Sequence, residues 1–185
     1  MKSIFFMLFV VCLSSCSLMD SVYESRFSSV KEPAAELFSM RIEHKKSVVF
    51  TGLLALHASR DLLAYTLLDN TGVTLLTAEF SAESGYRLIQ ATGKLGDSYL
   101  SQSLATTLQR IFLLEPRQQP CSRGLFSVFC KTRLKDGSWN KNLSIGPFTI
   151  WEMNSIETVR GVDPVIVYSQ PCQALMVKIE SIESL

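Results

Sequence analysis

Alternating apolar and polar residues run through most of the chain after residue 34, and this pattern predicts β-strands. Phe38, Met40 and Ile42 are separated by polar residues, so one face of that segment is apolar and the other is polar. Five such segments follow one another at 38–42, 47–58, 62–68, 73–80 and 86–90. Short turns separate them, and the turn Asp69–Gly72 places a glycine where a positive φ costs little. The pattern therefore predicts a five-stranded antiparallel meander.

The period of the pattern changes once, between residues 98 and 111. Leu100, Leu104, Leu108 and Ile111 recur every three to four residues with polar residues between them, and Pro116 follows. That spacing predicts one amphipathic helix, and residues 116–124 read as a loop. Alternation resumes at 126–131, 148–151, 165–168 and 175–179. About nine or ten strands and one helix predict a mostly-β domain of the α+β class.

A different apolar run, Ile4–Leu13, lies near the N-terminus behind the positive charge of Lys2. It is shorter than the roughly 20 apolar residues of a membrane-spanning helix, and it is typical of a secretory signal. The run leads into Ser14–Ser15–Cys16, which resembles the lipobox of bacterial lipoproteins. The resemblance implies that residues 1–15 are removed and that Cys16 carries acyl chains as a membrane anchor. The alternative is an ordinary signal whose cysteine is incidental.

Residues 16–33 are polar and read as a tether between the lipidated N-terminus and a domain at 34–185. Ser17 follows the cysteine, whereas an aspartate there tends to keep enterobacterial lipoproteins in the inner membrane. By that analogy we expect a lipid anchor in the outer membrane, with the domain facing the periplasm.

Charge gives little reason to expect a nucleic-acid partner. The chain has 18 basic and 17 acidic residues, a net charge of +1. A protein that binds nucleic acid through phosphate contacts needs a basic excess or a basic patch. We therefore expect no nucleic acid among its partners.

Three cysteines remain after Cys12 is lost with the signal and Cys16 is lipidated. In an oxidising compartment one pair of Cys121, Cys130 and Cys172 can form a disulfide. Cys121–Cys130 is the local choice and would join the loop to the following strand. Strand pairing can equally bring Cys172 near Cys130, so the alternatives stay open. The spacing does not fit a zinc site.

The motifs of common enzymes are missing from the sequence. It has no nucleophile elbow, metalloprotease helix, phosphate-binding loop or dinucleotide fingerprint. Its two histidines, His44 and His57, lie at a charged turn and near a strand end, positions typical of solvated residues. We therefore expect no enzymatic activity, no cofactor and no metal site.

Large apolar residues occupy both faces of 47–56 and 62–68, for example Leu53 and Leu54. An antiparallel sheet with one wet face should alternate cleanly. Either both faces are covered, or a bulge shifts the register, or the sheet curves around an apolar cavity under the helix. The candidate lining residues on strands are Phe50, Leu54, Tyr65, Leu67, Leu76, Phe80 and Leu88. Those on the helix are Leu104, Leu108 and Ile111. The same residues would also serve in an ordinary filled core.

The order of these features along the chain resembles that of the outer-membrane lipoproteins related to the lipoprotein-localisation receptor LolB. More narrowly it resembles the LolB-like family labelled DUF3261, whose hallmark matches Leu67–Val73, a strand ending in Leu-Leu-Asp-x-x-Gly. The resemblance implies an incomplete antiparallel β-barrel, as in LolA and LolB, wrapped around a central helix. It also implies an interior that takes lipid or lipoprotein acyl chains. LolB has a protruding loop with an exposed leucine, whereas the matching turns here, 60–61 and 69–72, are short and polar.

These observations together lead to one expected function and one alternative. We expect a membrane-anchored periplasmic lipoprotein that binds acyl chains or another apolar ligand and assists lipid or lipoprotein localisation at the outer membrane. The alternative is a non-enzymatic accessory lipoprotein that docks onto an envelope protein assembly, such as an export system for an aryl-polyene-type lipid. An empty, lined cavity would favour ligand binding, and a filled interior with a large exposed apolar patch would favour docking.

Overall fold

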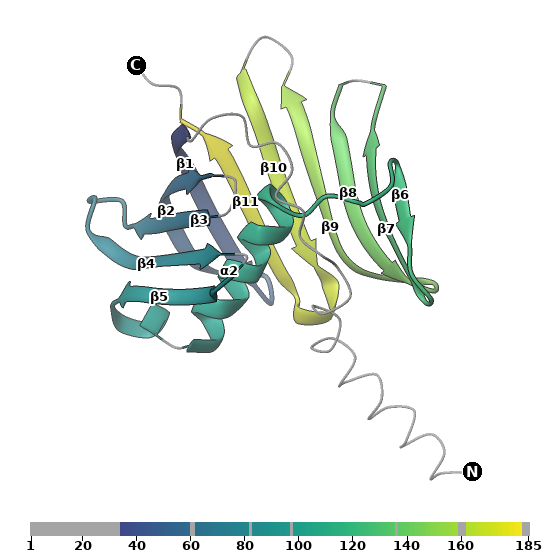
Figure 1. The fold of residues 1–185 in the computed structure, drawn as a ribbon. Coiled ribbons are helices and arrows are strands. Elements are labelled where there is room, and N and C mark those ends of the chain that lie inside the picture. The colour runs from purple at the N-terminus through teal and green to yellow at the C-terminus, as the bar shows by residue number, and fades with distance from the viewer. Residues whose placement is uncertain are drawn as a thin grey trace.

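The computed structural model describes residues 34–59, 62–81, 83–96, 98–135, 137–158 and 162–182 (Figure 1). The expected signal at 1–15, the lipidated Cys16, the tether at 16–33 and the turn at 60–61 lie outside the described residues.

Eleven antiparallel strands form one sheet in the described part of the chain. Along the sheet their order is β5-β4-β3-β2-β1-β11-β10-β9-β8-β7-β6. The strands are β1 (Ala34–His44), β2 (Ser47–Ala58), β3 (Leu62–Leu68), β4 (Thr74–Ser81), β5 (Gly85–Ala91), β6 (Cys121–Arg123), β7 (Ser127–Arg133), β8 (Trp139–Ile145), β9 (Phe148–Thr158), β10 (Val162–Gln170) and β11 (Leu175–Ser181).

The sheet consists of two meanders that meet at its centre. Strands β1 to β5 form the first meander and β6 to β11 the second, each from neighbouring hairpins. They are joined by β1 and β11, which pair from Phe38↔Ser181 to His44↔Leu175. The outer strands β5 and β6 do not pair with each other, so the sheet is curved but open (Figure 1). The expectation of a mostly-β domain with an incompletely closed antiparallel sheet is confirmed.

One α-helix, α2 (Ser98–Phe112), lies across the concave side of the sheet in the described part of the chain (Figure 1). It follows the short 3-10 helix η2 (Gly93–Gly96) and carries the chain from β5, at one edge, to β6, at the other. Its residues Leu104, Leu108 and Ile111 are buried at helical spacing, as the sequence predicted. The helix therefore covers the apolar face of both meanders.

The strands of the first meander bury one face only. In β3, Leu63, Tyr65 and Leu67 are fully buried, whereas the residues between them are partly exposed. Leu53 of β2 is also partly exposed. The large apolar residues on the second face thus do not mark a second covered layer. Alternation of burial is regular even where alternation of residue type is not.

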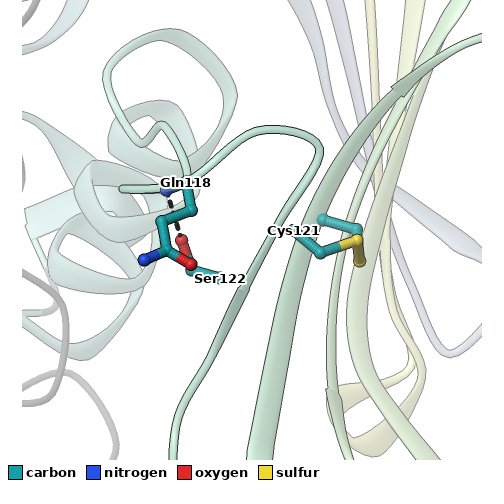
Figure 2. Close-up of a disulfide and its surroundings, with 4 residues drawn as sticks. Gln118, Cys121 and Ser122 are labelled. Carbon is teal, nitrogen blue, oxygen red and sulfur yellow. Dashed lines mark hydrogen bonds between the residues drawn. A yellow bond between two sulfur atoms is a disulfide. The ribbon is translucent and has the colours of Figure 1, made fainter.

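Two strands of the second meander were missed by the sequence pattern. β6 lies inside the predicted loop, and β8 has a polar sequence that places the buried Lys141 among its inward residues. β6 is three residues long and is linked to β7 by a disulfide between Cys121 and Cys130, which face each other in the strand register (Figure 2). The backbone N–H of Gln118 donates to Ser122 Oγ at 2.9 Å and holds the entry to β6. Cys172 is an exposed free thiol.

We expect the Cys121–Cys130 disulfide to stabilise the protein, because it closes a loop and fixes β6 at the edge of the sheet. A disulfide that closes a loop of this length restricts the unfolded chain and so raises the free energy of unfolding by about 2–3 kcal/mol. Replacing both cysteines by serine should therefore lower Tm by roughly 5–10 °C. Cys172→Ser is the matched control and should change Tm little, because Cys172 is exposed and unpaired. An unchanged Tm for the double variant under oxidising conditions would contradict the pairing.

Candidate functional site

An apolar hollow of about 620 Å³ lies between the N-terminal half of α2 and one end of the sheet. Strands β1, β2, β4 and β11 contribute to its wall, together with η2 and α2. The side chains that line it are mostly aliphatic or aromatic: Ile42, Val48, Val49, Phe50, Leu75, Thr92, Gly93, Leu95, Leu100, Ser103, Leu104, Thr107, Leu175 and Val177.

The hollow exists because short side chains face it from the helix. Ser103 and Thr107 lie one helical turn apart, next to the bulkier Leu100 and Leu104. Further along the helix, Leu108 and Ile111 fill the corresponding space with buried apolar side chains. The helix thus packs tightly on the sheet toward its C-terminus and leaves a space beneath its N-terminal half.

Only two of the residues proposed from the sequence line this hollow. Phe50 and Leu104 do so. Six others lie in the filled core of the described residues: Leu54, Tyr65, Leu67, Leu76, Leu108 and Ile111. Phe80 is partly buried and packs against that core, and Leu88 on β5 is exposed. The other eight candidates therefore do not line this hollow, and six of them take the filled-core role that the sequence left as the alternative.

The period of a sequence pattern reports which face of a strand a residue occupies, not how far along the strand it lies. The hollow is lined from strand ends, by Val48 and Val49 at the start of β2 and by Leu175 at the start of β11. One sequence signal was present: Val48 and Val49 are consecutive valines near the start of a strand, where alternation predicts that one of the two residues is polar.

Hydroxyl groups interrupt the apolar wall at one place. Thr107 is almost completely buried, and its Oγ1 has no hydrogen-bond partner among the described residues. Ser103 and Thr92 add two more hydroxyls to the lining. An unpaired buried hydroxyl is costly, and a ligand with one polar group near Thr107 would remove that cost. The wall therefore suits a molecule that is mostly hydrocarbon with a polar atom near the helix.

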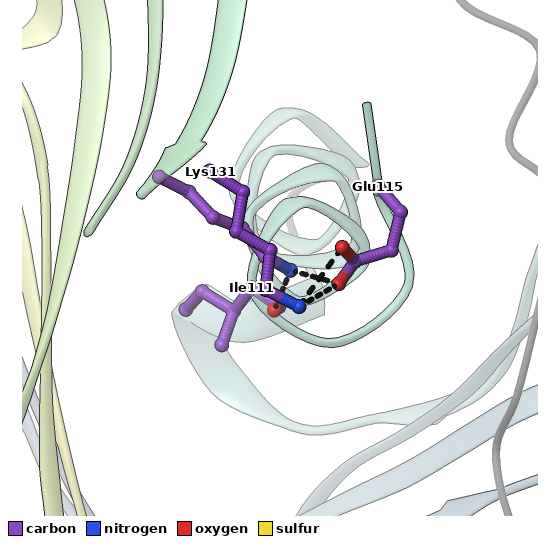
Figure 3. A network of polar contacts seen from close by, with 4 residues as sticks. Ile111, Glu115 and Lys131 are labelled. Carbon is purple, nitrogen blue, oxygen red and sulfur yellow. Dashed lines mark hydrogen bonds and ion pairs between the residues drawn. The ribbon is translucent and has the colours of Figure 1, made fainter. Parts of the chain in front are cut away.

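A network of charged groups holds the C-terminal end of α2, beyond the hollow (Figure 3). The Lys141 ammonium donates to the carbonyl oxygen of Ile111 at 3.0 Å and lies 3.0 Å from Glu115 Oε1. Lys131 donates to both oxygens of Glu115 at 2.8 and 2.9 Å. Both ammonium groups lie 5.0 Å from the centre of the Trp139 ring. Cations at a helix C-terminus also interact favourably with the helix dipole.

The burial of Lys141 changes its acidity. Its side chain is 1% exposed, and removal from water lowers the pKa of the ammonium group to about 8, while the Glu115 carboxylate opposes the fall. Arg110 strengthens the same end of the helix, because its Nη1 donates to Tyr168 Oη at 2.9 Å and to Gln170 Oε1 at 3.2 Å. These contacts fix α2 to the second meander.

A second hollow, of about 790 Å³, borders this network, because Lys131 and Trp139 are among its lining residues. Its lining is polar and charged: Gln119, Pro120, Lys131, Thr132, Arg133, Gly137 and Trp139. Lys131 is already paired with Glu115 in the network. We therefore take the apolar hollow under the N-terminal half of α2, rather than this one, as the candidate ligand site.

Comparison with known proteins adds no family to this picture: no protein-family model matches the chain, and neither does any curated protein. Among the described residues, no helix is long and apolar enough to cross a membrane. Within the same residues, no group of histidine, cysteine, aspartate or glutamate side chains is arranged to hold a metal ion. The apolar hollow under α2 therefore remains the candidate site.

We expect the buried Lys141 to make the stability of the protein rise with pH above about pH 8. Between pH 8 and the ordinary lysine pKa, the unfolded chain holds a proton that the folded chain has lost, so raising the pH favours the folded state. The gain should be on the order of 1–3 kcal/mol. Urea unfolding at pH 7.5 and 9.5 measures it, and Lys141→Met should abolish the rise. The exposed Lys135→Met is the control and should keep it; equal slopes in all three proteins would contradict the assignment.

Proposed function

We propose that this protein binds an acyl chain, or a similar hydrocarbon ligand, in the apolar hollow beneath α2. The observation that supports this most directly is a hollow of about 620 Å³ with a mostly aliphatic wall. Pockets for small ligands typically measure about 300–1,000 Å³ and carry few polar groups. The lining of this hollow follows that description, with hydroxyls from Ser103, Thr107 and Thr92 as its polar groups.

The expected affinity is modest, which suits a carrier that must also release its ligand. Each buried methylene contributes about 0.8 kcal/mol, so a chain of about twelve methylenes contributes roughly 10 kcal/mol before the cost of association. That cost is at least about 4 kcal/mol. The difference corresponds to a Kd on the order of 10–100 μM, so binding would be reversible.

The proposal extends to the place where the ligand is delivered. The lipobox-like sequence ending in Cys16 and the residue Ser17 after it support an anchor in the outer membrane, with the domain facing the periplasm. An open, curved antiparallel sheet with a helix on its concave side is also the architecture that the LolB-like resemblance leads one to expect. On these grounds the protein assists the localisation of lipids or lipoproteins at that membrane. The docking alternative predicts a filled interior, and the hollow favours ligand binding over it.

We expect Ser103→Trp to block ligand binding, because the indole would fill the hollow from the helix side. The Kd for a fluorescent fatty acid should rise by about tenfold or more, equivalent to at least ~1.4 kcal/mol. Gln102→Trp is the matched control, because Gln102 precedes Ser103 on the helix but is exposed. It should bind like the parent protein. Native mass spectrometry of the parent protein from membranes should reveal a lipid adduct that Ser103→Trp lacks. A parent protein without an adduct and without fatty-acid binding would overturn the proposal.

We expect Cys16→Ala to release the protein from the membrane, because the mutant has no sulfur atom to which a diacylglyceryl group can be attached. Two or more acyl chains make a stable anchor, and their loss leaves no comparable attachment. Fractionation of cells into membrane and periplasmic extracts measures the change, with Ser15→Ala as a variant that keeps the cysteine. Retention of Cys16→Ala in the membrane fraction would show that the lipobox interpretation is wrong.

A further inference from the structure

Four hairpin turns lie next to one another along one edge of the sheet. They connect β1 to β2 (Lys45–Lys46), β10 to β11 (171–174), β8 to β9 (Gly146–Pro147) and β6 to β7 (124–126). Because the strands are antiparallel and ordered β2-β1-β11-β10-β9-β8-β7-β6, all four turns fall at the same ends of the strands (Figure 1). We call this the hairpin edge.

Backbone hydrogen bonds tie the turns of the hairpin edge together in pairs. The N–H of Lys45 donates to the carbonyl oxygen of Ala174 at 2.8 Å, which joins the β1–β2 and β10–β11 turns. The N–H of Gly146 donates to the carbonyl oxygen of Phe126 at 3.2 Å, which joins the β8–β9 and β6–β7 turns. The edge is thus a continuous part of the fold and not a set of separate loops.

Three large apolar side chains project from the hairpin edge. Leu125, Phe126 and Phe148 are 89%, 73% and 69% exposed, the highest values among the large apolar residues that the structure describes. Leu125 and Phe126 lie in the β6–β7 turn, and Phe148 begins β9 directly after the β8–β9 turn; the Gly146–Phe126 hydrogen bond joins these two turns. Single exposed apolar residues are common on protein surfaces, whereas apolar residues gathered at one place make a candidate contact surface. We call this cluster the apolar tip.

The charges of the hairpin edge are of one sign. Lys45 and Lys46 are exposed in the β1–β2 turn, and the four turns contain no acidic residue. Arg123, also exposed, ends β6 directly before the turn that carries the apolar tip. Apolar side chains flanked by cations suit the surface of an anionic bilayer, where hydrocarbon lies beneath negatively charged headgroups.

The size of the apolar tip favours a bilayer over a protein partner. A stable complex buries about 800 Å² on each partner, and a large aromatic side chain supplies about 150–250 Å². Three side chains therefore fall short of a stable protein interface. Insertion into lipid requires no matching surface and gains from each apolar group separately.

The apolar hollow opens close to the same edge. Val48 and Val49 line it, are exposed and lie one residue beyond the Lys45–Lys46 turn, while Leu175 lines it directly after the β10–β11 turn. We propose that the hairpin edge rests on a lipid bilayer, with Leu125, Phe126 and Phe148 inserted among the acyl chains and the mouth of the hollow toward the lipid. This contact does not require the hollow to be occupied, so it stands independently of the proposed ligand.

The apolar tip is separate from the exposed loop that the LolB resemblance implies. The matching β3–β4 turn here is held by polar contacts, because Asp69 Oδ1 accepts hydrogen bonds from the backbone N–H groups of Thr71 and Val73 at 2.8 and 2.9 Å. The tip lies in the second meander, on strands at the other side of β1 and β11. The apolar part of the proposed contact is therefore formed by Leu125, Phe126 and Phe148 and not by the β3–β4 turn.

Tryptophan fluorescence in lipid vesicles tests this contact on the full chain. Phe126→Trp places a reporter at the tip, and Ile156→Trp places one at a 50%-exposed apolar position on β9. Ile156 lies eight residues from Phe148 along the strand, or roughly 26 Å. Each variant is reconstituted into vesicles of phosphatidylcholine and phosphatidylglycerol with brominated acyl chains. The emission of the parent protein, which contains Trp139 and Trp151, is subtracted.

We expect the added emission of Phe126→Trp to be shifted to the blue and to lose most of its intensity in brominated vesicles, while Ile156→Trp keeps its intensity. Equal quenching of both reporters would mean that the sheet lies flat on the membrane, and it would overturn the proposal. A blue shift without quenching would mean that a protein, or a second copy of this chain, covers the tip. Emission typical of tryptophan in water, without quenching, would mean that the tip lies in solvent. Either of the last two results would also overturn the proposal.

Discussion

The pairing of β1 with β11 is the interaction on which the rest of the structure depends. It joins strands from opposite ends of the domain, with Met40 opposite Ile179 and Ile42 opposite Val177, and these four side chains are buried. Closing so long a loop has an entropic cost that buried apolar area must offset. Without this ladder the two meanders would be separate sheets, and no single concave face would exist for α2 to cover. Ile42 and Val177 also line the hollow, so the same ladder shapes the candidate site.

The two halves of α2 make different contacts with the sheet, and this difference shapes the candidate site. Toward its C-terminus, the Arg110 guanidinium and the carbonyl oxygen of Ile111 bind groups of the second meander, including the buried Lys141. Toward its N-terminus, Ser103 and Thr107 face an empty space. Buried ionic contacts contribute little net free energy but require a defined geometry. They join the C-terminal end of the helix to the second meander, while its N-terminal half borders the hollow.

Much of the secondary structure could be predicted from local patterns, because burial alternates on strands and recurs every three to four residues on α2. Features set by distant contacts could not. β8 was missed because its inward residue is Lys141, whose burial depends on Glu115 and the end of α2. The lining of the hollow could not be told from core residues such as Leu54 and Tyr65, because a period does not report position along a strand. The Cys121–Cys130 pairing was within reach, because it is local.

An open sheet, unlike a closed barrel, retains two outer strands whose backbone groups can accept a further strand. These outer strands differ in length and in how firmly they are held. β6 offers three residues and is covalently joined to its neighbour, whereas β5 offers seven and pairs only with β4 among the described strands. Arg87 of β5, bound to Glu79, places a charge on that outer strand. Unwanted strand addition between copies of this chain would therefore begin at β5, and the charge at Arg87 is a barrier to it.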